Sequence, residues 1–82
     1  MRNLENVRLK CHLGNILKEQ GISALRLSKD IKYRRSTIND LINNTDMDKR
    51  RIPAQLIAKL CVYLDKEPND LFSIEYVSDK PK

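Results

Sequence analysis

The chain has 82 residues, a formal net charge of +5 and a pI near 9.4. A chain of this length forms one domain and excludes a second core, and one Phe with no Trp leaves the core to Leu, Ile and Val. Two cysteines are too few for a disulfide framework, so we expect a reduced protein. The sequence shows no signal peptide and no apolar run of about 18 residues, so we expect it to be cytoplasmic, with no membrane partner.

Residues 7–20 predict a short strand followed by a helix. Apolar and polar residues alternate over 7–11, which is the period of a strand. From about residue 12 to residue 20, apolar side chains recur at helical spacing and form an inner stripe made of Leu13, Ile16 and Leu17. Gly21 then stands where a left-handed residue would end the helix.

Two more helices are predicted around a turn at residues 32–34. The first spans about 24–31, with Ser23 placed to cap it and with Leu27 and Ile31 facing inward. The second spans about 35–43. Two short helices joined by a tight turn are the arrangement that places a helix in a DNA groove.

The helix at 35–43 has a dry face and a wet face. The dry face suits a core and holds Ile38, Leu41 and Ile42. The wet face holds polar side chains that suit base edges in a major groove, namely Arg35, Ser36, Asn39 and Asp40. Arginine can bond guanine, asparagine can bond adenine, and aspartate can accept a hydrogen bond from cytosine. A carboxylate is repelled by phosphates, so Asp40 could instead orient a nearby arginine. The alternative for this whole face is a solvated helix surface.

The rest of the chain predicts two helices and a second strand. A polar loop follows residue 43 and ends in Lys49-Arg50-Arg51. Pro53 fits the first turn of a fourth helix that reaches about Leu64. Residues 68–72 indicate a short fifth helix opened by proline, and residues 73–77 alternate like a strand.

The two strand candidates are expected to pair, within one chain or across a dimer. A lone short strand leaves backbone donors and acceptors without partners. Pairing of 7–11 with 74–77 should bring Leu9, Ile74 and Tyr76 together over the first or fifth helix. The predicted fold is therefore all-α, a single five-helix domain over residues 1–82 with its core at about 12–72, and with short terminal strands.

Charge and chemistry favour a nucleic-acid partner over catalysis. Residues 1–52 hold 12 Lys and Arg against 6 Asp and Glu, whereas residues 53–82 hold 4 against 5. Such an excess favours a polyanion, although a merely solvated surface is the alternative. Cys11-His12 has no further Cys or His at ligand spacing, and no catalytic constellation is visible, so we expect no metal, no cofactor and no enzyme.

In the order of its motifs, the chain resembles the Xre/Cro family of lambda-repressor-like helix-turn-helix proteins over about residues 13–72. Ile22-Ser23 matches the pair that opens the family's second helix, and Arg34-Arg35-Ser36-Thr37-Ile38 matches the start of its recognition helix. Asn43-Asn44 stands where Asn-Gly is common. The segment Pro68-Asn69-Asp70-Leu71-Phe72 is similar to the last helix of the family.

The resemblance implies a DNA site made of two sets of residues. The set expected to read bases is Arg35, Ser36, Thr37, Asn39 and Asp40. The set expected to hold phosphates without reading sequence is Ser23, Lys32, Arg34, Asn43, Lys49, Arg50 and Arg51. Ser23 could equally act as a helix cap, and the two roles are compatible.

Several positions depart from the family pattern. Ala24 replaces a glutamine that grips phosphate, and Lys32 replaces the glycine of the turn. A left-handed lysine costs about 1 kcal/mol, so a turn of different shape is one alternative. Leu25 stands at a usual surface position and is expected to cover another element or a partner. Arg34 is a poor helix cap and a better phosphate ligand.

These features predict a transcriptional regulator that binds double-stranded DNA sequence-specifically as a homodimer and represses by occluding a promoter. The alternative is a protein-interaction module, such as an antitoxin or anti-regulator with a protein partner. RNA binding is a third class, and the helix face lacks the stacking aromatics that single strands favour, Tyr33 excepted.

Overall fold

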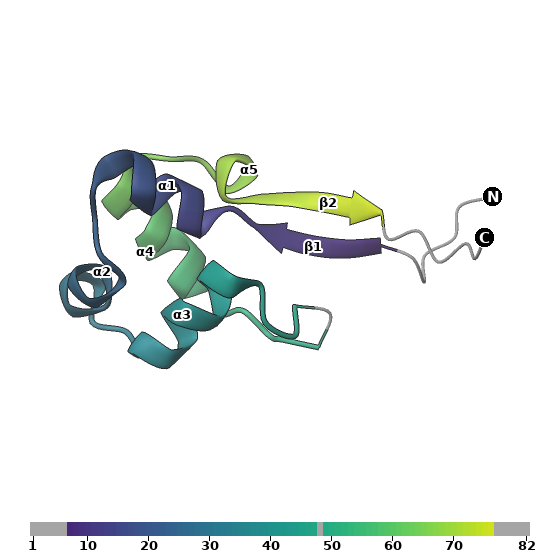
Figure 1. Cartoon of the computed structure of the whole chain (residues 1–82), viewed down its shortest axis with the longest axis horizontal. Helices are drawn as coiled ribbons and strands as arrows, with labels where there is room; N and C mark the ends of the chain where they lie inside the picture. The colour runs from purple at the N-terminus through teal and green to yellow at the C-terminus, as the bar shows by residue number, and fades with distance from the viewer. Residues whose placement is uncertain (1–6, 48, 77–82) are drawn as a thin grey trace.

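The structure is a computed structural model, and it describes residues 7–47 and 49–76. Within these residues the elements follow the order β1 (Val7–Cys11), α1 (Leu13–Gln20), α2 (Ala24–Ile31), α3 (Arg35–Asn43), α4 (Ala54–Leu64), α5 (Pro68–Leu71) and β2 (Phe72–Tyr76). The helices gather into one body, and the two strands project from it as a ribbon (Figure 1). The predicted five-helix all-α domain with paired terminal strands is confirmed.

Three element boundaries differ from the predicted ones by a residue. His12 is the N-cap of α1 and not its first helical residue. Pro53 has the extended conformation of an N-cap, with φ −62° and ψ 139°, so α4 begins at Ala54. Phe72 is extended, with φ −132° and ψ 148°, and begins β2 instead of ending α5. Val77, predicted to end the second strand, lies outside the described residues.

Each of the four longer helices ends on a residue in the left-handed conformation. These residues are Gly21, Lys32, Asn44 and Asp65. Lys32 has φ 58° and ψ 55°, so the turn between α2 and α3 keeps the left-handed shape that glycine would adopt. The alternative of a differently shaped turn was therefore wrong. The Tyr33 N–H donates to the Ser28 carbonyl at 3.0 Å, and this bond closes the turn.

The core lies between the helices and is built almost entirely from leucine and isoleucine. Its fully buried side chains are Leu13, Leu27, Ile38, Leu41, Leu56, Leu60, Leu64 and Leu71. Ser28 is buried among them, and its hydroxyl donates to the Leu25 carbonyl at 2.9 Å, which satisfies its polar group. Within the described residues, no helix is both long and apolar enough to cross a membrane.

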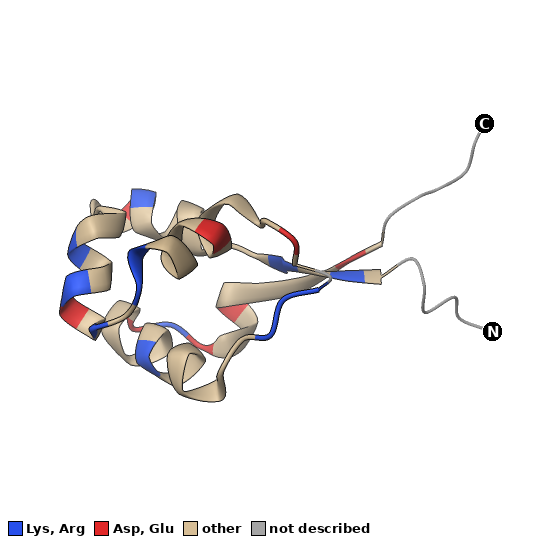
Figure 2. Cartoon of the chain, turned by 90° about the horizontal axis from the view of Figure 1, so that it is seen from below, with Lys and Arg blue, Asp and Glu red and all other residues tan. Residues whose placement is uncertain are grey.

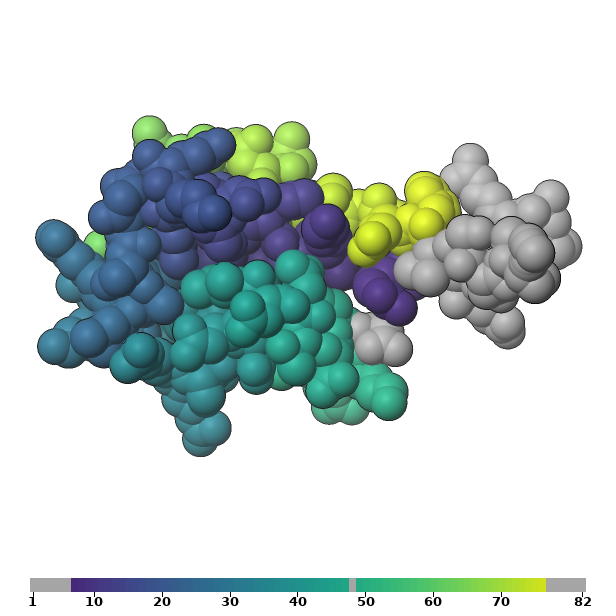
Figure 3. All heavy atoms as spheres, in the orientation of Figure 1, coloured from purple at the N-terminus to yellow at the C-terminus, as the bar shows by residue number. Residues whose placement is uncertain are grey.

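The strands pair with each other in one chain, as predicted. They are antiparallel, with Val7 opposite Tyr76 and Leu9 opposite Ile74. Only Leu9 of the expected apolar group packs partly against the core, whereas Ile74 is 58% exposed and Tyr76 is 73% exposed. The expectation that Ile74 and Tyr76 would cover a helix was wrong, because the ribbon extends past the ends of the helices (Figures 1 and 3).

Candidate nucleic-acid interface

Helix α3 presents the residues that the sequence predicts to read bases. Ile38 and Leu41 are buried in the core, which fixes the rotation of the helix about its own axis. On its other side Arg35 and Ser36 are exposed, Thr37, Asn39 and Asp40 are half-buried, and Asn43 is exposed. The predicted division of α3 into a dry face and a wet face is therefore present in the fold.

Close packing against α1 also sets the position of α3. A Cβ atom built on Gly14 would lie 3.1 Å from Cγ2 of Ile42, closer than an ordinary van der Waals contact. Any larger residue at position 14 would push on the end of α3. Gly14 is thus a positioning residue that the sequence reasoning did not single out.

The N-terminus of α3 lies beside a hollow and is surrounded by positively charged side chains. Arg34 is the N-cap, its side chain makes no capping hydrogen bond, and the first turn carries no acidic residue. The first backbone N–H groups of a helix lack partners within the helix and attract anions. Beside this end lies a hollow of about 410 Å³ lined by Lys32, Tyr33, Arg34 and Thr37.

The hollow at the N-terminus of α3 has the groups needed to bind a phosphate. Two cations, a hydroxyl and a helix N-terminus converge there, and each can interact with phosphate oxygens. Three of the predicted site residues, Lys32, Arg34 and Thr37, are thereby brought to one place. Thr37, expected to read bases, lines the hollow together with two of the predicted phosphate ligands.

Ser23 has a defined structural role at the start of α2. Its hydroxyl oxygen accepts from the Arg26 N–H at 3.1 Å, as an N-cap does. Of the two compatible roles that the sequence left open, the capping role is present. The hydroxyl group is exposed and keeps its own proton to donate.

Asp40 and Arg50 form the closest ion pair at this surface. Nη2 of Arg50 lies 2.7 Å from Oδ2 of Asp40, and Nε of Arg50 donates to the Thr45 carbonyl at 3.3 Å. The suggestion that Asp40 could orient an arginine thus has a named partner. The guanidinium offsets the negative charge of this carboxylate, and it fastens the segment after α3 to the helix.

Lys49 and Arg51 flank Arg50 in the sequence and are exposed. Lys and Arg also lie along α2 and at the start of α3, with acidic residues among them (Figure 2). These cations lie on separate elements and alternate with acidic side chains (Figure 2). A distributed pattern of this kind suits contacts with successive phosphates.

The Cys11-His12 pair forms part of the ribbon base. Cys11 is buried, and burial raises the pKa of its thiol. Nε2 of His12 is hydrogen-bonded to Oγ of Ser73 at 2.7 Å, and the His12 N–H donates to the Leu71 carbonyl at 2.7 Å. Among the residues that the structure describes, no group of three His, Cys, Asp or Glu side chains could hold a metal ion.

Comparison with known families decides what this arrangement is. The model of the Cro/C1-type helix-turn-helix DNA-binding domain matches residues 12–76, which is most of the chain. The chain belongs to this family. A solved structure described as the transcriptional regulator VanUg has a similar fold, with a TM-score of 0.69 at 16% sequence identity. The match covers 93% of this chain and 99% of that one. No curated protein sequence matches the chain.

In this Cro/C1-type domain, three side-chain contacts fasten α4 to the two helices that precede α3 in the chain. Nζ of Lys59 donates to the Ile31 carbonyl at 3.1 Å, and the Tyr63 hydroxyl donates to Asp30. Gln20 donates to the Leu64 carbonyl at 2.9 Å. The first two contacts join α4 to α2, the helix that precedes α3, and the third joins α1 to the end of α4.

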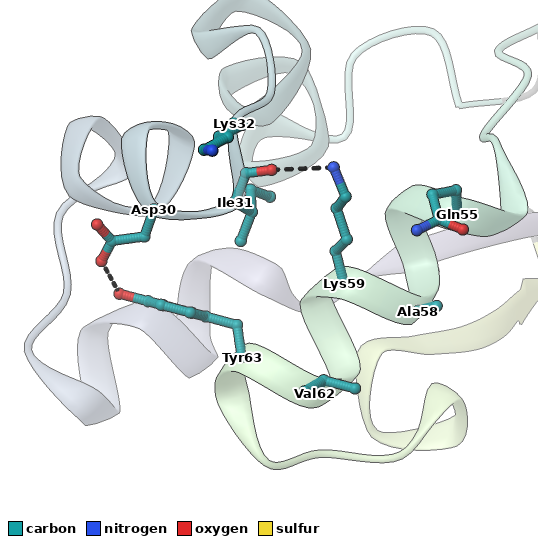
Figure 4. A pocket seen from close by; sticks show the side chains of 8 residues that line it. All are labelled: Asp30, Ile31, Lys32, Gln55, Ala58, Lys59, Val62 and Tyr63. Atoms are coloured by element: carbon teal, nitrogen blue, oxygen red, sulfur yellow. Dashed lines mark hydrogen bonds between the residues drawn. The ribbon is translucent and has the colours of Figure 1, made fainter.

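Figure 4 shows two of these contacts at the rim of a hollow of about 500 Å³ between the end of α2 and α4. The hydrogen bond to Asp30 raises the pKa of Tyr63 above its ordinary value. The sequence reasoning did not identify Lys59 or Tyr63. Their spacing of four residues, with polar groups on one side of a largely apolar helix, is the signal that could have found them.

Proposed function

We propose that this Cro/C1-type domain regulates transcription by binding double-stranded DNA sequence-specifically, with α3 inserted into the major groove. The observation that carries the proposal is the exposed face of α3, where Arg35 and Ser36 stand free above a side packed in the core. A short helix that is anchored on one side and hydrogen-bonding on the other can enter the major groove and contact base edges.

The proposed roles divide along the surface. Arg35, Ser36 and Asn39 would contact bases, and each good bidentate contact would contribute about 1–3 kcal/mol of discrimination. Lys32 and Arg34, at the start of α3, would hold one phosphate, with Thr37 close to both. Lys49 and Arg51 would hold phosphates on the other side of the helix, and Ser23 and Asn43 would add weaker contacts.

Asp40 and Arg50 act as a pair in this proposal. Since the guanidinium of Arg50 already binds Oδ2 of Asp40, the carboxylate keeps only Oδ1 free to accept from cytosine. Arg50 would approach a phosphate while remaining bound to Asp40 and Thr45. Its larger contribution would then be to shape the segment after α3.

Regulation would act through occupancy of the operator. A bound domain of this size can repress by covering a promoter, and two copies on adjacent half-sites would supply the interface that one recognition helix lacks. We therefore propose a homodimeric repressor. Its control would come from protein concentration, from oligomerisation or from a partner.

Selection from random duplex DNA, followed by a salt titration of binding to the selected and a scrambled duplex, tests the proposal. A specific binder enriches one motif, prefers that duplex, and loses affinity steeply with salt because it displaces counterions from phosphates. The failure of any motif to emerge, together with no measurable affinity at low salt, would refute DNA recognition.

A protein-interaction module is the second candidate, and one observation favours it. Leu25 is 43% exposed and lies at a hollow of about 330 Å³ with Arg26 and Lys29. Leu25 is not among the side chains that pack on the core in the described part of the chain, so of the two expected contacts, another element or a partner, a partner is the one that this candidate function would supply. A module of this kind would bind an acidic protein partner and would show little DNA affinity at any salt concentration.

A further inference from the structure

The ribbon formed by β1 and β2 has one apolar face and one charged face. Residues directly opposite in an antiparallel pair point to the same side. The register therefore places all the apolar residues of the ribbon on one face, namely Val7, Leu9, Cys11, Phe72, Ile74 and Tyr76. The other face carries Arg8 opposite Glu75 and Lys10 opposite Ser73.

The apolar face begins at the core and continues into solvent. Cys11 at its base is 3% exposed, whereas Val7 is 37%, Ile74 is 58% and Tyr76 is 73% exposed. The projecting end of the ribbon stands clear of the helices in the space-filling view (Figure 3). A two-stranded ribbon by itself is only marginally stable in water, and packing of another element on its apolar face stabilises it.

We propose that this apolar face is the contact between two copies of the chain, each ribbon packing face to face on the other. The face carries no charge, so a second identical face can cover it without desolvating an ion, as a two-fold interface requires. The charged residues Arg8, Lys10 and Glu75 stay on the outer sides in water. The whole chain carries a net charge of +5, which opposes the association of two copies, so an uncharged face is where they can meet.

The area sets the strength of this contact. An aromatic side chain presents roughly 150–250 Å² and an aliphatic one less, so the exposed fractions of Val7, Ile74 and Tyr76 leave at most on the order of 300 Å² per copy. Stable interfaces bury about 800 Å² per partner. The dimer is therefore weak in solution, and occupation of adjacent DNA half-sites completes it.

Sedimentation equilibrium of the full chain tests the dimer without DNA. The wild-type mass should rise from 9.6 kDa toward twice that value as the concentration is raised from about 5 to about 500 µM. The double variant Ile74→Thr/Tyr76→Thr keeps strand-forming residues and removes most of the exposed apolar area. It should stay at 9.6 kDa over the same range.

Val62→Thr is the matched control. Val62 is 84% exposed on α4, away from the ribbon, so this variant should dimerise like the wild type. Circular dichroism and the midpoint of thermal unfolding establish that all three proteins fold. A wild-type chain that remains monomeric throughout, or a ribbon variant that dimerises normally, overturns the proposal. The first of these results would leave another partner, or the terminal residues of the chain itself, as the occupant of the face.

A second measurement, of cooperative binding to DNA, rests on the proposed function and is interpreted separately from the mass measurement. On a selected duplex with one half-site, the ribbon variant should bind as well as the wild type. On a duplex with two half-sites it should lose cooperativity, so that the binding curve becomes that of independent sites. If the wild type binds no duplex, DNA recognition fails and the mass measurement still decides the ribbon contact. Equal cooperativity of the variant and the wild type would contradict the ribbon contact alone.

Discussion

The side chain of Asn44 pairs with both backbone groups of Cys11. The Cys11 N–H donates to Oδ1 of Asn44 at 2.7 Å, and Nδ2 of Asn44 donates to the Cys11 carbonyl at 3.0 Å. Asn44 is also the left-handed residue that ends α3, with φ 56°. A side-chain amide has the same donor and acceptor as a peptide group, so Asn44 binds β1 much as a neighbouring strand would. The end of α3 is thereby joined to the base of the ribbon.

Asn44→Gly tests this connection, because glycine keeps the left-handed conformation and removes only the side chain. The variant leaves the Cys11 N–H and carbonyl without partners, so we expect unfolding by urea to show a loss of about 1–3 kcal/mol. Asn43→Ala, at the exposed neighbouring position, is the control and should unfold like the wild type. Equal stability of Asn44→Gly and the wild type would show that the two hydrogen bonds contribute nothing net.

Lys32→Gly should stabilise the fold while weakening DNA binding. Glycine relieves the left-handed strain, which is worth about 1 kcal/mol, and part of that gain is offset by the greater freedom of glycine in the unfolded chain. Loss of a phosphate contact should flatten the dependence of log affinity on log salt concentration by about one unit. Urea unfolding and a salt titration of binding measure the two effects.

Asp65→Gly is the matched control for Lys32→Gly. Asp65 is left-handed as well, with φ 58°, and it ends α4 away from α3. It should gain similar stability with an unchanged salt dependence. If both variants bind DNA equally, Lys32 does not hold a phosphate.

A double-mutant cycle on Asp40 and Arg50 measures their pairing. We expect the effects of Asp40→Ala and Arg50→Ala on the free energy of unfolding to be non-additive by roughly 0.5–1 kcal/mol, because the pair is short but Asp40 is partly open to solvent. Additive effects would mean that the pair does not form in solution. Arg51→Ala should leave stability unchanged and weaken all duplexes alike.

Arg35→Ala and Asn39→Ala should relax sequence preference and leave the fold intact. Both side chains stand on the wet side of α3, and removing a base contact lowers affinity for the selected duplex more than for a scrambled one. Competition binding with the two duplexes gives the ratio of affinities. A parallel fall on both duplexes would assign these residues to the backbone of the DNA instead.

The hydrogen bond between Tyr63 and Asp30 should make stability depend on alkaline pH. Since this bond raises the pKa of Tyr63 above its ordinary 10.0, its contribution is fully present below pH 10 and is lost as the pH rises through the raised value. Urea unfolding of wild type and Tyr63→Phe should therefore differ at pH 8, with the difference shrinking above pH 10. A difference that grows with pH would have the wrong sign and would exclude this bond.

Patterns within a few residues determined much of this protein from its sequence. The helical spacing of Leu13, Ile16 and Leu17, the glycine at position 21 and the alternation over residues 7–11 each reflect a preference that neighbouring residues settle among themselves. The same applies to the two faces of α3. A helix with apolar residues along one side has only one side to bury, so the exposure of Arg35 and Ser36 followed from local periodicity.

Only the tertiary structure decided which distant side chains meet. Asn44 lies 33 residues from Cys11, and Tyr63 lies 33 residues from Asp30. No local preference encodes such a pair, because it forms only after the core has brought two elements together. The exposure of Ile74 and Tyr76 was decided in the same way. An alternating strand predicts an apolar face, but the extent of the helical body determines how much of that face is covered, and here the ribbon projects past the helices (Figure 1).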